Sequence, residues 1–301
     1  MQPPRVGVVG TGPWARNTHL PAAARSLHVD LVGVLGRTGT EQVASEFDIR
    51  GYQDLDAFLE DIDIAVMAVP PATQVSLAVR AAERGVHLLL EKPLAVDVAH
   101  ARAVEAAVER SGVVGAVFFT HLFVPSRETW LADRAREGRW TGLTIQSFGG
   151  LLADGTDPYA ASTWRRSSGG LWDLGPHAVA QACRLFGAVV AVTARRGSGD
   201  LMSARLTHRD GGSTDMMTAL DRPGEIGGFA LRGPDGVSVP PPIGDWGAVA
   251  RDAAESALGM IVQRMRDRAP MAADVALGRH VVDVLAGVEL AASSGSMVRL
   301  G

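Results

Sequence analysis

The sequence has little cysteine and no clustered positive charge. Its one cysteine, Cys183, excludes a disulfide within the chain and any metal site built on cysteine ligands. Lysine and arginine number 29 against 33 aspartates and glutamates, which gives a net charge of −4. This balance argues against a nucleic-acid-binding surface, and we expect no nucleic-acid partner.

Long apolar runs are also missing, and without one of about 20 residues no membrane-spanning helix is expected. We expect an apolar strand soon after Met1, and therefore no signal peptide. The isolated histidines lack the spacing of metal ligands, so we expect no metal. Together these absences predict a soluble, cytoplasmic protein.

What the sequence does contain is a regular alternation of apolar strands and helical segments over its first 120 residues. Repeated strand–helix–strand units of this spacing predict a doubly wound parallel sheet. After residue 120 the pattern changes to β-like runs separated by turn signals, which predicts a large, mainly antiparallel open sheet. In this second half we expect helices at 126–137, 172–186, 246–268 and 273–293.

A glycine-rich turn follows the first strand, where residues 10–15 read Gly-Thr-Gly-Pro-Trp-Ala. Gly10 makes a tight turn, Gly12 lets a pyrophosphate approach the backbone, and Ala15 keeps the next helix close to the sheet. This predicts dinucleotide binding, the alternative being a turn with a purely structural role. The turn residues expected at the cofactor are Gly10, Thr11, Gly12, Pro13 and Trp14.

The end of the second strand predicts which dinucleotide binds. An acidic residue there would bind the ribose 2′-hydroxyl of NAD, but this chain has Gly36, Arg37 and Thr38. A guanidinium and a hydroxyl can hold a 2′-phosphate, so we expect NADP in preference to NAD. The alternative is an arginine that faces solvent.

A lysine follows a strand of three leucines, residues 88–90, within the sequence Glu91-Lys92-Pro93. Such a strand is typical of the centre of a parallel sheet, whose carboxyl edge is where ligands bind. Pro93 restricts the backbone of Lys92. Another apolar strand ends at Pro70, so Pro70, Glu91 and Lys92 are expected near the cofactor, although a surface lysine is the simpler alternative.

A second polar group occurs in the segment Gly169–His177. Asp173 and His177 are four residues apart, so on a helix they share a face and the carboxylate can orient the imidazole. A histidine is a suitable proton carrier near neutral pH. A contact at a helix start is the alternative.

Taken together and in order, these motifs resemble the glucose–fructose oxidoreductase/inositol dehydrogenase (Gfo/Idh/MocA) family. The resemblance implies a Rossmann dinucleotide-binding domain, expected at 1–120, and an α/β domain for substrate binding and oligomerisation, expected at 121–301. The C-terminal helix could pack back on the first domain. The motifs that carry the resemblance are Gly10-x-Gly12-x-x-Ala15, His19-Leu-Pro21, Glu91-Lys92-Pro93, Phe123-x-Pro125, Trp164-Arg165 and Gly169-Gly170-x-x-Asp173-x-Gly175-x-His177.

The resemblance also implies roles for single residues. Lys92, Asp173 and His177 match the family's catalytic group and would contact the substrate. Trp164 and Arg165 match a pair that lies near the nicotinamide or the substrate. Independently, His121 ends a strand at the domain junction, where a substrate contact is one of two interpretations.

Three departures from the family weaken the expectation of a polyol substrate such as inositol. Leu122 stands where many members have an arginine, and Ala180 where many have an acid. Only two tyrosines are present, Tyr52 and Tyr159.

The function that follows is an NADP-dependent oxidoreductase interconverting a secondary alcohol and a ketone on a small, carbohydrate-like substrate. Two alternatives stay open: a dinucleotide-binding sensor without turnover, and a lyase or hydrolase that oxidises its substrate transiently with a retained cofactor. Val189–Val192 and Met216–Leu220 do not alternate cleanly between apolar and polar residues, so we expect an apolar outer sheet face. A homodimer or homotetramer through this sheet is therefore expected.

Overall fold

The computed structural model describes residues 2–153, 159, 162–224, 227–268 and 270–301. The chain divides into two compact units. The first consists of Met1–Val124 and Ile243–Arg279, and the second of Pro125–Pro242 and His280–Gly301. The roles expected for the two domains stay predictions: dinucleotide binding for residues 1–120, and substrate binding and oligomerisation for residues 121–301.

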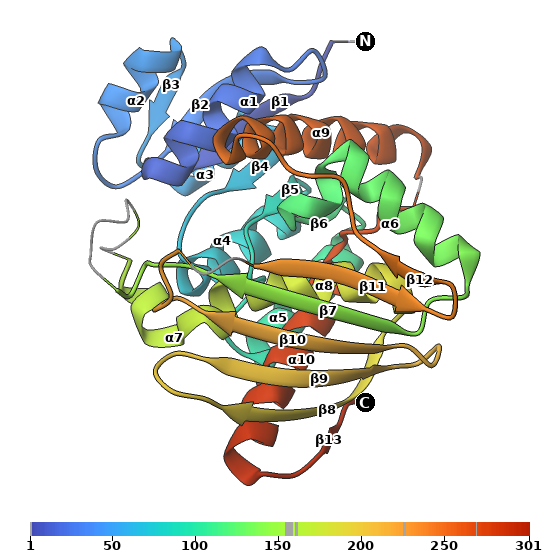
Figure 1. Cartoon of the computed structure of the whole chain (residues 1–301). Helices are drawn as coiled ribbons and strands as arrows, with labels where there is room; N and C mark the ends of the chain where they lie inside the picture. Colours follow the sequence, from blue (N-terminus) through green and yellow to red (C-terminus); the bar gives the residue numbers. More distant parts are fainter. Residues whose placement is uncertain (1, 154–158, 160–161, 225–226, 269) are drawn as a thin grey trace. The chain divides into compact units, whose positions relative to one another are not determined.

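The first unit is built on a parallel sheet with the strand order β3-β2-β1-β4-β5-β6 (Figure 1). Its order reverses beside β1, which creates the crevice where doubly wound sheets bind ligands. Leu88, Leu89 and Leu90 on β5 are at most 1% exposed, as expected for a strand covered on both faces. The strands are β1 (Arg5–Val9), β2 (Asp30–Leu35), β3 (Arg50–Tyr52), β4 (Ile64–Met67), β5 (His87–Leu90) and β6 (Gly115–Val117).

Helices connect these strands, and one further helix joins the unit from late in the sequence. Helix α9 (Trp246–Asp267) packs against α1, where Arg25 pairs with Asp252 and, at 2.9 Å, with Glu255. The other helices are the π-helical turn η1 (Ala15–His19), α1 (Leu20–Arg25), α2 (Thr40–Phe47), α3 (Leu55–Glu60), α4 (Pro71–Glu83), α5 (Val98–Ser111) and the 3₁₀ turn η2 (Thr120–Phe123).

The second unit is built on a sheet with the strand order β12-β11-β7-β10-β9-β8-β13 (Figure 1). Neighbouring strands are antiparallel except β7 and β10, which are parallel. The expected fold class, a doubly wound parallel sheet with a mainly antiparallel second sheet, is thereby confirmed. The strands are β7 (Gly142–Phe148), β8 (Val189–Arg196), β9 (Met202–His208), β10 (Ser213–Ala219), β11 (Gly228–Gly233), β12 (Gly236–Ser238) and β13 (Val298–Arg299).

The helices of this unit are α6 (Pro125–Glu137), α7 (Thr163–Asp173), α8 (Gly175–Phe186) and the greater part of α10 (Val275–Ser294). The expected helix over 172–186 is divided, because α7 ends at Asp173 and α8 begins at Gly175. Leu174 between them keeps a right-handed helical conformation, at φ −97° and ψ −35°. The backbone therefore stays helical through Leu174.

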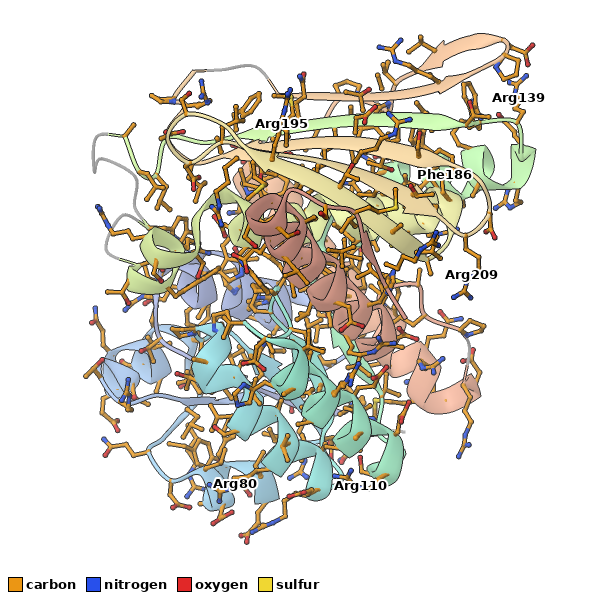
Figure 2. All side chains as sticks on the ribbon, turned by 90° about the horizontal axis from the view of Figure 1, so that it is seen from below. Arg80, Arg110, Arg139, Phe186, Arg195 and Arg209 are labelled. Atoms are coloured by element: carbon orange, nitrogen blue, oxygen red, sulfur yellow. The ribbon has the colours of Figure 1, made fainter. Side chains whose placement is uncertain are left out.

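The outer face of the second sheet is polar, and the expectation of an apolar face is wrong. On β9 the buried residues Met202, Ala204 and Leu206 alternate with Ser203, Arg205 and Thr207, and Arg205 bonds Asp215 of β10 at 3.0 Å. Met216 is buried, whereas Met217 lies in register with Ser203 on the other face. Exposed arginines such as Arg195 on β8 add to the polar surface of the unit (Figure 2).

No helix in the described ranges is long and apolar enough to cross a membrane.

Candidate active site

The glycine turn after β1 has the geometry that a dinucleotide requires. Gly10 has φ 121° and donates its N–H to the Leu35 carbonyl at 2.8 Å. A Cβ at Gly10 would lie 2.4 Å from the carbonyl oxygen of Ala68, so no larger residue fits there. A Cβ at Gly12 would meet nothing within 4 Å, which leaves the backbone open on that side.

The side chain of Glu91 connects this turn to the lysine. Glu91 is 8% exposed, and its Oε1 accepts hydrogen bonds from Trp14 Nε1 at 2.5 Å and pairs with His19 Nε2 at 2.7 Å. Its Oε2 accepts the backbone N–H of Lys92 at 3.2 Å. Residues from the first helix and from the end of β5 therefore converge on one carboxylate, and Lys92 follows it directly.

Gln74 of α4 holds the backbone of the same turn. Its Oε1 accepts the Glu91 N–H at 2.7 Å, and its Nε2 donates to the Glu91 carbonyl at 2.8 Å and the Leu94 carbonyl at 3.2 Å. Gln74 is fully buried and the Lys92–Pro93 peptide bond is cis. Sequence reasoning missed Gln74, because a glutamine on a helix gives no pattern that points to backbone partners 17 to 20 residues later.

The turn expected to choose the cofactor lies beside the glycine turn. Thr11 Oγ1 donates to the Thr38 carbonyl at 2.8 Å, which joins the two turns. Arg37 is exposed and makes no hydrogen bond or ion pair within the described ranges. Pro70 caps α4 just after β4, the strand next to β1, so all these expected cofactor residues lie at carboxyl ends of neighbouring strands.

In the second unit, Asp173 is held by an arginine. Arg165 Nε donates to Asp173 Oδ1 at 3.0 Å, and both side chains are largely buried. The Arg165 guanidinium also lies 4.9 Å from the ring centre of Trp164 and 5.0 Å from that of Tyr159. The sequence predicts that Asp173 orients His177. This role stays a prediction, in addition to the observed bond between Asp173 and Arg165.

A carboxylate from another turn contacts the two glycines that precede Asp173 and requires the first of them to be a glycine. Asp200, in the β8–β9 turn, accepts the Gly170 N–H at 2.8 Å and the Leu220 N–H at 2.7 Å. Gly169 has φ 68°, and a Cβ there would lie 2.2 Å from Asp200 Oδ1. Asp200 thus fixes the start of the helical segment that carries Asp173.

Sequence reasoning missed Asp200 because it lies 30 residues after Gly170 in an ordinary turn, with no motif of its own.

His121 has a different environment from these groups. It lies in η2 of the first unit, with its ring 5.4 Å from that of Trp246 on α9. Its assignment to the substrate stays a prediction. Among described residues, no three His, Cys, Asp or Glu side chains are grouped as metal ligands.

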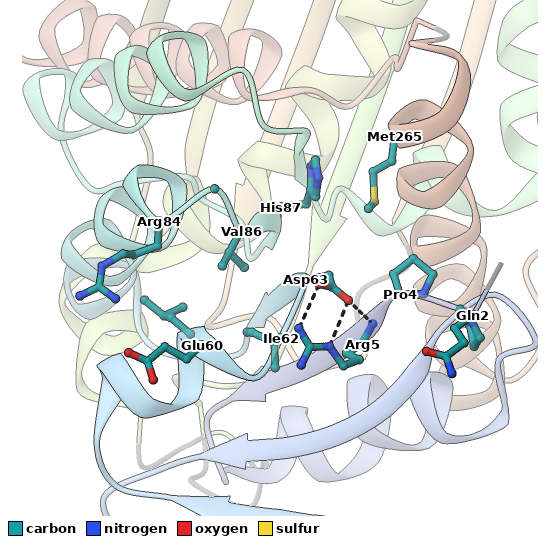
Figure 3. Close-up of a pocket in the computed structure, with 13 residues that line it drawn as sticks. Gln2, Pro4, Arg5, Glu60, Ile62, Asp63, Arg84, Val86, His87 and Met265 are labelled. Atoms are coloured by element: carbon teal, nitrogen blue, oxygen red, sulfur yellow. Dashed lines mark hydrogen bonds and ion pairs between the residues drawn. The ribbon is translucent and has the colours of Figure 1, made fainter.

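A pocket of about 610 Å³ in the first unit contains none of the expected site residues (Figure 3). It lies at the amino ends of the parallel strands, where Arg5 bonds Asp63 through its backbone N–H at 2.8 Å and its Nη2 at 3.2 Å. His87, the first residue of β5, also lines it. Doubly wound sheets bind their ligands at the opposite, carboxyl edge.

Residues 4–119 match the sequence model of the GFO_IDH_MocA group, described as an oxidoreductase family with an NAD-binding Rossmann fold. The resemblance read from the motifs is confirmed over these residues, which are similar to the Gfo/Idh/MocA family.

Named relatives agree with this assignment. An uncharacterized oxidoreductase, YdgJ, of Escherichia coli is 28% identical over 63% of this chain and 55% of its own length. The dTDP-3,4-didehydro-2,6-dideoxy-alpha-D-glucose 3-reductase of Streptomyces violaceoruber is 30% identical over 78% of this chain and 64% of its own length. The chain thus spans just over half the length of the first of these relatives.

Among solved structures, an oxidoreductase from Agrobacterium radiobacter in complex with NAD+, L-tartaric acid and magnesium superposes with a TM-score of 0.83. The match covers 98% of both chains at 17% identity, so it establishes the fold.

Proposed function

We propose that this chain is an NADP-dependent oxidoreductase that interconverts a secondary alcohol and a ketone on a small, carbohydrate-like substrate. The observation that carries the proposal is the Glu91 carboxylate, which bonds Trp14 of the dinucleotide turn and the backbone of Lys92. A lysine held beside a dinucleotide-binding turn is placed to act on the group that exchanges a hydride with the cofactor.

The residues would divide the chemistry as follows. The nicotinamide supplies hydride transfer when it is bound. In the oxidative direction His177 takes the hydroxyl proton, and Lys92 donates a hydrogen bond to the same oxygen and stabilises its negative charge. Asp173, held by Arg165, orients His177. The alternative assignment makes Lys92 the proton carrier.

For the cofactor, Gly10, Gly12 and Thr11 would hold the pyrophosphate, with Arg37 and Thr38 at the 2′-phosphate. The exposed Arg37 and the lack of an acid at the end of β2 support NADP. The Agrobacterium oxidoreductase was crystallised in complex with NAD+, so a direct comparison of the two cofactors is needed.

The proposed substrate class follows from the family and from the sugar named in the Streptomyces reductase. We further propose a homodimer, or a tetramer of dimers, through the second sheet. A cytoplasmic location stays a prediction from the sequence.

The test is a screen of sugars, sugar nucleotides, inositols and small ketones, followed by NADPH absorbance. On an identified substrate, Lys92→Ala and His177→Ala should each lower kcat by roughly 10²–10⁴ with NADPH affinity within a few-fold of wild type. Wild-type turnover in either variant would show that the residue is wrongly assigned. NADPH binding without turnover in the screen would favour a sensor, and copurified nucleotide without net turnover would favour a retained cofactor.

A further inference from the structure

Arg127 is a buried cation for which two of the three side-chain nitrogens have no hydrogen-bond partner among the described residues. It lies in the first turn of α6 and is 8% exposed. Its Nε and Nη1 atoms are buried and have no hydrogen-bond partner within the described structure. A charge removed from water needs a partner, because neither solvent nor a counter-charge compensates for its lost hydration.

The acidic residues of the same helix do not neutralise it, because each is paired with another arginine. These pairs are Arg184–Glu128 at 2.8 Å, Arg136–Asp133 at 2.7 Å and Arg134–Glu137 at 2.8 Å. The position of Arg127 in the first turn of the helix adds to the cost of its uncompensated positive charge, since the amino end of a helix favours negative charge.

The guanidinium lies against an aromatic ring. Its carbon lies 5.1 Å from the ring centre of Phe229 on β11, and Phe229 packs edge-on against Trp130, one turn after Arg127, at 5.7 Å. A ring attracts the cation but accepts none of the in-plane N–H groups. Burial lowers the pKa of Arg127 to about 10, which still leaves it protonated at neutral pH.

We propose that Arg127, walled by Phe229 and Trp130, is a binding site for an anionic group, a carboxylate or a phosphate. A guanidinium presents paired N–H donors that match the oxygens of either group, and the first-turn N–H groups of α6 favour the same charge. If the group is part of the sugar-like substrate, the inference rests on the proposed function. If it is a free anion, the inference stands independently.

The first experiment uses binding and needs no turnover. Thermal unfolding is measured with and without inorganic phosphate, at saturating NADPH, for the wild type, Arg127→Leu and the control Arg136→Leu. Arg136 is on the same helix but is exposed and paired. Phosphate should raise the Tm of the wild type and of R136L and leave that of R127L unchanged. Without phosphate, R127L should be at least as stable as wild type, because it removes an unpaired buried charge.

The second experiment identifies the source of the anion. Turnover is compared for glucose, glucose 6-phosphate and glucuronate with the same three proteins. If the substrate carries the group, an anionic sugar should have a KM about 10- to 100-fold below that of glucose, and R127L should abolish the difference while R136L keeps it. Phosphate stabilisation without such a preference assigns the site to a free anion.

Three results would overturn the proposal. The first is neither a phosphate effect nor a preference for anionic sugars in the wild type. The second is a phosphate shift that persists in R127L, because the anion then binds elsewhere. The third is a loss of stability in R127L without phosphate, which would show that the cation already has a partner within the chain. The proposed function and this inference can fail separately. If phosphate raises the Tm of the wild type but not of R127L, and no substrate is turned over, the proposed function is contradicted and this inference still holds.

Discussion

At the scale of single residues, the carboxylate of Glu91 explains why a tryptophan and a histidine follow the glycine turn. Trp14 and His19 both present ring nitrogens to Glu91 Oε1, and His19 is 2% exposed. A buried carboxylate needs such donors, because its negative charge has lost its hydration. The motif residues around Lys92 are thus bound to one another, and each has a physical reason for its identity.

The choice of cofactor is tested at Arg37. Arg37→Ala should weaken NADPH binding by about 1.5–3 kcal/mol, because a charge-assisted bond to the 2′-phosphate is lost, and should leave NADH binding nearly unchanged. Titration of both cofactors by fluorescence measures the difference. Equal weakening of both, or tighter binding of NADH by the wild type, would show that Arg37 does not select the cofactor.

At the scale of elements, the turn between β8 and β9 supports the helix that carries Asp173. Asp200→Ala would leave the N–H groups of Gly170 and Leu220 without their acceptor. We expect a loss of about 1.5–3 kcal/mol in unfolding free energy. We also expect a fall in kcat that exceeds any change in NADPH affinity, since the cofactor turns belong to the other unit.

Asp200→Asn is the matched control. Both N–H groups bond the same oxygen of Asp200, Oδ2, and an amide oxygen can replace it. If kcat falls in D200A but is close to wild type in D200N, the two hydrogen bonds position the helix that carries Asp173, and the loss in D200A is not due to general destabilisation. Equal kcat in D200A and the wild type would contradict the positioning role.

A second element-scale prediction concerns His208, which joins β9 to the end of α8. It is 2% exposed, its Nδ1 donates to the Gly187 carbonyl at 2.9 Å, and its Nε2 lies 2.9 Å from Thr214 Oγ1. Burial lowers the pKa of His208, opposed by the Gly187 bond and by Asp210. The native state therefore binds a proton less readily than the unfolded state.

The contribution of His208 to the free energy of unfolding should thus be complete above the pKa of histidine in the unfolded state, about 6.5. It should be lost as the pH falls through the lower pKa of His208 in the folded state. In thermal unfolding between pH 8 and 5, His208→Gln should show a smaller loss of Tm on acidification than the wild type. An identical slope in H208Q would contradict the assignment.

Local sequence patterns predicted the strands and helices of the first unit well. They did not predict the residues that hold the backbone of the candidate site in place. The buried leucines of β5 and the turn at Gly10 follow from runs and spacings within ten residues. Gln74 and Asp200 act on backbone atoms far along the chain, so no local pattern reveals them. The outer face of the second sheet was misjudged because adjacent apolar residues, such as Met216 and Met217, point to opposite faces once the register is known.

At the scale of the whole molecule, the polar outer face changes the kind of interface to be expected. Non-obligate interfaces are about as polar as the rest of a protein surface, so the face remains suitable for a dimer. Such a dimer should depend on charge, and Arg205 is its natural test because it pairs with Asp215 in the middle of the face.

We expect light scattering of the wild type at micromolar concentration to give a mass at least twice the 31.6 kDa of one chain. Arg205→Glu would place like charges on neighbouring strands and repel the facing copy, so it should shift the protein towards the monomer. Arg139→Glu reverses a charge at another exposed arginine, paired with Asp235 beside β12, and should leave the mass unchanged. A wild-type mass near 31.6 kDa would rule out the assembly, and equal dissociation of R205E and R139E would place the interface elsewhere.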